Sequence, residues 1–274
     1  MSKLPCEILD HIVDLLHDSR TPLRNYCLVS KSWITRTRTH LFARVEFQTA
    51  DSLESWKKIF PDPSTSPAHY TKVLLIGGSA VVTAVDVEAG SWIRGFSRVV
   101  HLAVVGEYPA TPGCTEAAFN QIRGFLPSVK SFCINYVVFS PSQLWDLILS
   151  FPLLEDLSVI GSYPVFASGD DHHDGLSTAT QPSSLPVFTG SLELLLSGRM
   201  RPTLHHWLSL PGGVHFRRLA LKWTCKEDIS LTVVLIEECT HTLESLDITD
   251  DYARGTFVGH PMRPHRDNLL PLTS

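Results

Sequence analysis

A run of residues that could bind a metal lies near the middle of the chain, at Asp170-Asp171-His172-His173-Asp174. Imidazole nitrogens and carboxylate oxygens are ligands of divalent ions such as zinc and manganese. The run belongs to residues 162–186, which are rich in Ser, Gly, Asp, Pro and Thr. This composition predicts a solvated loop, in which adjacent side chains have no fixed geometry around an ion. We therefore expect no metal site; a metal-dependent enzyme using this loop would require tight zinc or manganese binding.

Other patterns that could support catalysis are incomplete. The sequence has no Gly-x-Ser-x-Gly, no phosphate-binding glycine-rich loop ending in Lys-Ser/Thr and no His-Glu-x-x-His. Gly77-Gly78-Ser79 lacks the later glycine and the acidic residue of a dinucleotide site, which favours a simple bend. His205-His206 are expected on a helix surface, and the adjacent carboxylates Glu237-Glu238 and Asp250-Asp251 should point in different directions. The sequence predicts neither an enzyme nor a bound cofactor.

The composition is that of a globular protein. Of the 274 residues, 43% are hydrophobic and 19% are charged, and the formal net charge is -5. These values argue against wholesale disorder, and the length is sufficient for a substantial core. Arg36, Arg38 and Arg44 are interleaved with uncharged residues and form no basic stripe with stacking aromatics. We therefore expect no nucleic-acid partner.

The cysteine spacing and the apolar segments of the sequence predict an intracellular location. The six cysteines lie far apart and include no Cys-x-x-Cys pair, as expected for reduced thiols. Asp10, His11 and Asp14 interrupt the first apolar run, so we expect no secretory signal. The apolar run within residues 73–85 is interrupted and too short to span a membrane. The predicted location is intracellular, in the cytoplasm, the nucleus or both, without a membrane partner.

Three short helices are predicted near the N-terminus. Pro5 suits the first helical residue, and Glu7 lies favourably in the first turn. Thr21 and Pro22 predict the start of a second helix, and Ser30 caps a third. In the first helix, apolar residues recur every three or four positions, at Ile8, Leu9, Ile12, Val13, Leu15 and Leu16. The residues expected to face inward from the next two helices are Leu23, Tyr26, Cys27, Leu28, Trp33, Ile34 and Leu41.

The strings Leu4-Pro5-Cys6-Glu7-Ile8-Leu9 and Cys27-Leu28-Val29-Ser30-Lys31-Ser32-Trp33, with Ile12 between them, resemble the F-box. In that family a three-helix module binds the Skp adaptor and, through it, the cullin scaffold of Skp-cullin-F-box ubiquitin ligases. The resemblance implies adaptor contact through Leu4, Pro5, Ile8, Ile12, Leu15, Leu23, Val29, Lys31 and Trp33. Alternatively, the three helices form a cap whose apolar residues all serve an internal core. Such short helices cannot bury so wide an apolar arc by themselves, which favours a partner.

A repeat follows these helices. Pairs of apolar residues separated by one position recur at Val45/Phe47, Leu74/Ile76, Leu102/Val104, Phe132/Ile134, Leu157/Val159, Leu194/Leu196, Leu219/Leu221 and Leu246/Ile248. The first members of successive pairs are 29, 28, 30, 25, 37, 25 and 27 residues apart. Each pair predicts a strand that buries one face, and the long step contains the loop of residues 162–186. This period is typical of a leucine-rich-repeat-like solenoid.

Helical spacing fills the intervals between these strands, at residues 53–60, 92–96, 117–126, 144–151, 204–210 and 229–239. The predicted fold class is therefore α/β. A small three-helix F-box module in residues 1–47 precedes an irregular leucine-rich-repeat-like α/β solenoid with a parallel sheet in residues 48–274. Residues 251–274 contain few apolar anchors, so we expect an incomplete C-terminal cap that is frayed or covered by a partner.

These features predict a substrate receptor of a Skp-cullin-F-box ubiquitin ligase, which binds an adaptor through its helices and an unidentified target protein through its strands. Residues expected on the exposed face of the strands, and hence available to the target, are Lys130, Ser158, Glu193, Lys222 and Asp247. The alternative is a scaffold protein that uses the solenoid alone. The two hypotheses differ in whether Ile8, Ile12, Leu15 and Trp33 form an exposed patch or pack against the first repeats.

Overall fold

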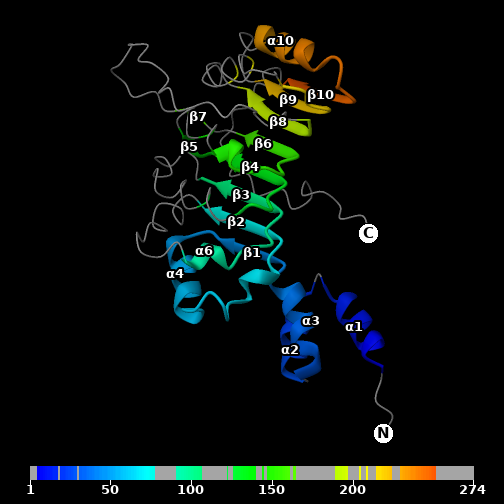
Figure 1. Ribbon diagram of the computed structural model, residues 1–274, viewed down its shortest axis with the longest axis vertical. Helices are drawn as coiled ribbons and strands as arrows, with labels where there is room; N and C mark the ends of the chain where they lie inside the picture. The colour runs from blue at the N-terminus through cyan, green and yellow to red at the C-terminus, as the bar shows by residue number, and fades with distance from the viewer. Residues whose placement is uncertain are drawn as a thin grey trace.

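The structure is a computed structural model of the 274-residue chain. It describes residues 5–17, 19–29, 31–77, 91–106, 122, 126–139, 144, 147–160, 163–164, 189–196, 204, 208, 214–223 and 229–250. The fold is mixed α/β, as predicted, and is built on a parallel eight-stranded sheet. Three helices lie at one end of the long axis, and helix α10 (Ile229–Cys239) lies at the other (Figure 1).

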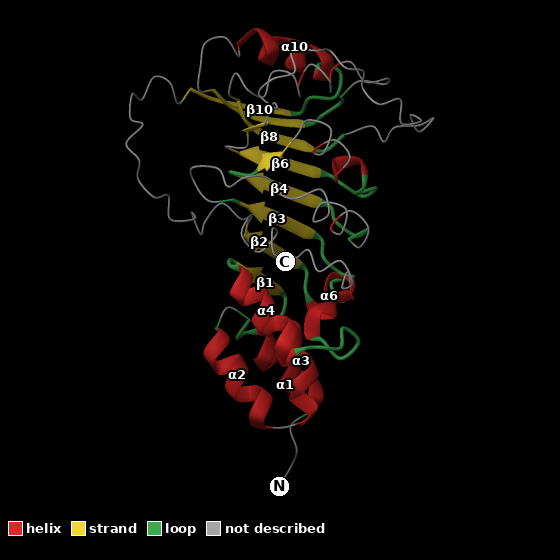
Figure 2. Cartoon of the chain, turned by 90° about the vertical axis from the view of Figure 1, so that its left-hand side faces the viewer, coloured by secondary structure: helices red, strands yellow, loops and turns green. Residues whose placement is uncertain are grey.

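The sheet follows the order of the chain, so each strand pairs with its nearest neighbours in sequence within this sheet. Its strands are β1 (Arg44–Phe47), β2 (Val73–Gly77), β3 (His101–Val105), β4 (Ser131–Asn135), β6 (Asp156–Ile160), β8 (Ser191–Leu196), β9 (Arg218–Trp223) and β10 (Ser245–Asp250). All seven pairings are parallel. In a view turned by 90° about the vertical axis, the strands form a regular stack (Figure 2).

One backbone hydrogen bond recurs just before the strands. The Lys72 N–H donates to the Ala43 carbonyl at 2.9 Å, and Val100 donates in the same way to Lys72 at 2.8 Å. Lys130 continues the series by donating to the Val100 carbonyl at 2.8 Å. Because a parallel sheet needs a long return between strands, this repeated bond fixes where each return ends and its strand begins.

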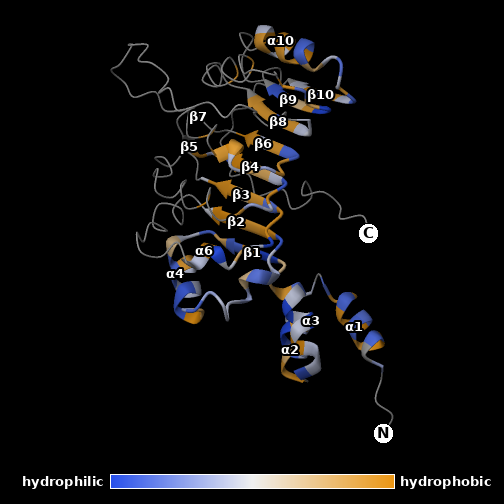
Figure 3. Cartoon of the chain, viewed as in Figure 1, coloured by the Kyte–Doolittle hydropathy of each residue, from blue (hydrophilic) through white to orange (hydrophobic). Residues whose placement is uncertain are grey.

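The second and fourth residues of the strands form the core from β1 to β9. They are buried, as the alternating pattern predicted. Hydrophobic colour runs along the strands of this sheet (Figure 3). One predicted pair is wrong: Leu157 and Val159 align with Leu192 and Leu194, one alternation earlier than the predicted Leu194/Leu196. Leu192, Leu194 and Leu196 share one strand face, so sequence alternation alone did not choose between the two registers.

Helices and turns cover the buried side of the first strands. Helix α4 (Ala50–Ile59) begins at Thr49, whose side chain accepts a hydrogen bond from the Ser52 N–H. It is followed by the 3₁₀ helix η1 (Pro67–Tyr70) and by α6 (Ser91–Arg94). An aromatic cluster fills this end of the core, with edge-on contacts among its rings. Its members are Phe42, Phe47, Trp56, Phe60, Trp92 and Phe96.

A second, two-stranded sheet was not predicted. Strand β5 (Val138–Phe139) pairs in parallel with β7 (Tyr163–Pro164), so the start of the stretch predicted as a loop, residues 162–186, is a strand. Tyr136 has a φ of 53° at the exit of β4. A Cβ atom on Gly106 would lie 2.0 Å from the Tyr136 carbonyl oxygen. The close approach of the backbone at Tyr136 to residue 106 therefore requires glycine at this position. Two-residue strands carry too little pattern to be found from sequence.

The bend predicted at Gly77-Gly78-Ser79 is described only at its first residue. Gly77 ends β2, and a Cβ atom there would lie 2.3 Å from the Gln48 carbonyl oxygen. The glycine therefore serves close packing of β2 against the exit of β1. The other two residues of this bend lie outside the described residues.

Three helices precede the sheet: α1 (Cys6–Asp14), α2 (Arg20–Val29) and α3 (Lys31–Leu41). Pro5 is the N-cap of α1 rather than its first residue, and α2 begins at Arg20, before the predicted Thr21-Pro22 start. Pro22 is tolerated there because the first turn of a helix leaves its N–H groups unpaired. The predicted cap Ser30 lies outside the described residues.

The last strand differs from the others. Leu246 and Ile248 occupy the positions that are buried in β1 to β9, yet they are 42% and 40% exposed. The prediction that this pair is buried is therefore wrong, because no further layer of described residues covers it. Residues 251–274, where an incomplete cap was predicted, lie outside the described residues, as do Asp170–Asp174 and His205-His206.

No helix within the described ranges has both the length and the apolar character needed to cross a membrane.

Candidate protein-interaction site

Helix α1 exposes part of its apolar arc. Val13 is fully buried, whereas Ile8 is 48% exposed and Leu15, just past the helix end, is 70% exposed. Ile12 is half-buried. A single buried stripe would have placed all of these side chains against α3. The sequence predicted the arc, and the structure shows that only part of it is used inside the molecule.

An ionic cluster at the end of α1 attaches this helix to α3. Arg36 donates from Nε to Asp14 Oδ1 at 2.6 Å, and its second nitrogen binds Oδ2 of the same carboxylate. The His40 Nε2–H donates to Oδ1 at 2.7 Å, because an ionised carboxylate can only accept. The hydrogen bonds from Arg36, aided by His40, lower the pKa of Asp14 to about 2. Asp14 is thus a polar link that joins α1 to α3.

Helix α2 turns two of its apolar residues outward. Leu23 is fully buried and forms the core of this helix pair, whereas Leu28 and Val29 are 86% and 67% exposed. The prediction that Leu28 faces inward is therefore wrong. Leu28 follows Leu23 by five positions, not three or four, and so lies on a different side of the helix. Helical spacing could have identified it as an additional surface residue.

Helices α2 and α3 are joined by aromatic and polar contacts. The rings of Tyr26 and Trp33 lie with their centroids 4.8 Å apart. The Thr37 side chain is buried and lies 2.8 Å from Cys27 Sγ. These contacts leave Trp33 half-buried and Lys31 exposed. Trp33 therefore contributes both to the helix pair and to its surface.

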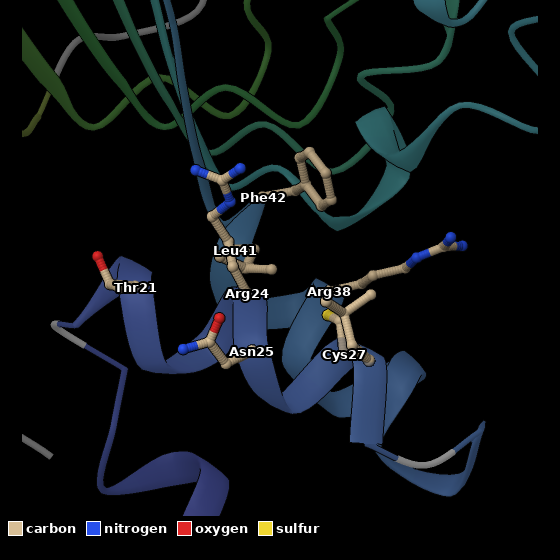
Figure 4. A pocket seen from close by; sticks show the side chains of 8 residues that line it. Thr21, Arg24, Asn25, Cys27, Arg38, Leu41 and Phe42 are labelled. Carbon is tan, nitrogen blue, oxygen red and sulfur yellow. The ribbon is translucent and has the colours of Figure 1, made fainter.

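A shallow hollow of about 430 Å³ lies between α2, α3 and the start of the sheet (Figure 4). Its lining combines two arginines with apolar side chains: Thr21, Arg24, Asn25, Cys27, Leu28, Arg38, Leu41 and Phe42. Residues 20–44 contain Lys and Arg but neither Asp nor Glu, so the hollow lies in a basic region. The exposed Leu28 beside two arginines forms a surface suited to another protein.

The nine residues predicted to contact an adaptor divide into four groups. Pro5, Ile8, Leu15, Val29 and Lys31 are exposed on α1, α2 and α3 or beside them. Ile12 and Trp33 are half-buried. Leu23 is buried and has no surface to offer, and Leu4 lies outside the described residues. The exposed members and Leu28 constitute the candidate site.

The open face of the sheet brings together three of the five residues predicted to contact a target. Ser158 donates from Oγ to Glu193 Oε2 at 2.9 Å, and Lys222 Nζ donates to Oε1 of the same carboxylate at 2.9 Å. Ser158 is directly opposite Glu193 in the register, and Lys222 is two residues beyond its other partner, Ala220. A polar chain therefore crosses β6, β8 and β9.

The other two predicted residues lie apart from this chain. Lys130 precedes β4 and forms an exposed ion pair with Glu155, with Nζ and Oε1 2.7 Å apart. Asp247 is exposed on the edge strand β10. Cys133, on the same face, was not predicted, and burial raises the pKa of its thiol above the ordinary value. A raised thiol pKa lowers the thiolate fraction, so Cys133 is a weak nucleophile.

Within the described part of the chain, no three His, Cys, Asp or Glu residues are grouped so that they could hold a metal ion. The thiols of Cys27, Cys133 and Cys239 are free. The described residues thus present an apolar and basic surface on the helices and a polar surface on the sheet.

No protein-family model matches the chain, and no curated protein matches it.

Proposed function

We propose that this chain is the substrate receptor of a Skp-cullin-F-box type ubiquitin ligase. The observation that carries the proposal is the exposure of Leu15, Leu28 and Val29 on short helices whose sequence resembles the F-box. Large apolar side chains that a fold leaves exposed mark surfaces that another protein covers. In this proposal α1–α3 form the F-box module and bind a Skp-type adaptor.

The remaining chain supports the second half of the proposal. One strand for each 25 to 35 residues, in sequential parallel order, is the pattern expected of an irregular leucine-rich-repeat-like solenoid. The open strand face carries the chain formed by Ser158, Glu193 and Lys222. Polar groups arrayed on a rigid face select a protein partner by complementarity more than by buried area. We propose that this face holds the target protein.

The mechanism follows from holding two proteins on one body. The helices attach the chain to the adaptor and, through it, to the cullin scaffold, while the sheet holds the target near the conjugating enzyme. Transfer of ubiquitin is then accelerated because the effective concentration of the target rises. The chain needs no catalytic group and no cofactor for this role, and its site of action is intracellular.

A calorimetric titration of the full chain with a purified Skp adaptor tests the proposal. The key variant is L15K combined with V29K, which places two charges on the exposed apolar surface without entering the core. We expect submicromolar binding by the wild type and loss of that binding in the double variant. The matched control is I59K, because Ile59 is 68% exposed on α4, away from the three helices.

Binding that the double variant retains would show that the adaptor uses another surface. Absence of binding by the folded wild type would contradict the receptor proposal and favour a scaffold protein that uses its sheet alone. Circular dichroism of all variants establishes that the fold is intact.

A further inference from the structure

The end of the sheet at β10 exposes an apolar side that the other strands bury. Leu246 and Ile248 are open on β10, and Val233, which is 47% exposed, and Val234 are open on α10. Both views place α10 beside β10 at this end (Figures 1 and 2). The opposite end is closed, because α4 and the aromatic cluster cover Phe47 of β1. The sheet therefore ends at β10 with the apolar side of its last strand left uncovered by the described residues.

The same strand leaves one backbone edge unpaired among the described residues. Residues 245–250 pair in register with residues 218–223 of β9 on one side. Within the described ranges no strand pairs with the other side. An edge with free N–H and C=O groups is a template for an added strand. Side chains alternate between the two faces of a strand. Every second residue of an added strand would therefore lie on the same face as Leu246 and Ile248 and beside them.

The charge of this end selects among possible partners. Residues 229–250 contain no Lys or Arg, but they contain Glu237, Glu238, Glu244, Asp247 and Asp250. The basic residues of β9 are already near carboxylates, with Lys222 bonded to Glu193 and Arg218 3.9 Å from Asp156. Glu244 lies 3.9 Å from Arg217, whereas no ion pair is formed by Asp247, Glu237 or Glu238 among the described residues. The exposed edge is thus acidic, with Asp247 between its two open apolar residues.

We propose that the β10 edge binds an extended basic segment of another protein as an added strand. Its apolar residues would cover Leu246 and Ile248, and the lysines or arginines between them would face Asp247. A second copy of this chain fits poorly, because the antiparallel register that pairs Leu246 of one copy with Ile248 of the other would also place the two Asp247 residues opposite each other. The inference goes beyond the proposed function: it concerns the opposite end of the molecule and holds whether or not the helices bind an adaptor.

Fluorescence anisotropy with synthetic peptides and the full chain tests this surface. The probe is a short peptide in which lysine and valine alternate. One comparison peptide replaces lysine by glutamate, and another carries N-methyl groups on alternate amides, which prevents strand pairing without changing charge. We expect each comparison peptide to bind at least about tenfold more weakly than the probe.

Two protein variants separate this edge from general charge attraction. D247K should weaken binding of the probe by about tenfold, whereas E155K, the same charge change beside β6, should leave it unchanged. Hydrogen exchange should show new protection of the β10 amides when the probe binds. Equal binding of the N-methylated peptide, or an unaltered affinity in D247K, would overturn the proposal. So would slow exchange, in the free chain, of the β10 amides that point away from β9, because residues 251–274 or a second copy would then cover the edge.

Discussion

The middle of the sheet buries the apolar residues of its core face, whereas each end of the molecule leaves several apolar residues exposed. In β3 and β4, Leu102, Val104, Phe132 and Ile134 are almost wholly inaccessible. At the helical end Leu28 is almost fully exposed, and at the other end Ile248 is open although it has the same place in its strand as Ile134. The same residue types therefore stabilise the fold in one region and remain available for partners in the others.

The difference shows that the role of an apolar residue is decided by its neighbours. A strand in the middle of the sheet has a neighbouring strand on each side, so its alternating apolar residues belong to the core whether or not another protein is bound. A strand or helix at an end has a layer on one side only. Substitutions in the middle should consequently alter stability, and substitutions at the ends should alter binding.

The largest effect is expected at Phe132. Its ring is fully buried and lies 5.3 Å from that of Phe151, so F132A should lower the free energy of unfolding by about 3–5 kcal/mol. L28A, also a loss of a large apolar side chain, should change it by less than about 0.5 kcal/mol. Urea unfolding followed by circular dichroism gives both values. A similar decrease in the free energy of unfolding of F132A and L28A would contradict the proposed difference between the middle of the sheet and the ends of the molecule.

The next effect is expected at the link between α1 and α3. D14N removes the charge that Arg36 and His40 share, and these side chains are partly exposed, so the cost should be about 1 kcal/mol or less. Hydrogen exchange should quicken in α1 and stay unchanged in β3 and β4. Faster exchange throughout the sheet would show that the helices and the sheet unfold as one unit.

The pH dependence of the same link should be smaller and confined to acid. The pKa of Asp14 is lowered from 3.8 to about 2, so the folded state favours the ionised form. Its stabilising contribution is present in full above about pH 4 and is lost as the pH falls towards 2. Amide chemical shifts of α1 should follow this titration in the wild type. D14N should lack it, and a matching step in D14N would assign the titration to another group.

The smallest effect on stability is expected at the open edge. I248S should change the free energy of unfolding by less than about 0.5 kcal/mol, because the side chain is already partly in water. L221S, at the equivalent position of β9, should cost several times more because it leaves a hydroxyl and a cavity in the core. Thermal unfolding compares them. A large loss in I248S would mean that Ile248 is covered in solution.

The sequence predicted the parallel strands because their alternation repeats, and it predicted three N-terminal helices from caps and spacing. It misplaced one pair, since Leu192, Leu194 and Leu196 offer two equivalent registers. It also failed where burial depends on what lies beyond an element, at Leu28 and Ile248. The ionic cluster of Asp14 joins residues far apart in the chain, which no local pattern signals.

Hydrogen exchange of the full chain, free and saturated with a purified Skp adaptor, tests the central proposal most directly. We expect slower exchange across α1 and α2, where Leu15, Leu28 and Val29 are exposed, and unchanged exchange in β3, β4 and β6. Protection confined to the strands, or none at saturating adaptor, would contradict the proposal that the three helices are the adaptor-binding module.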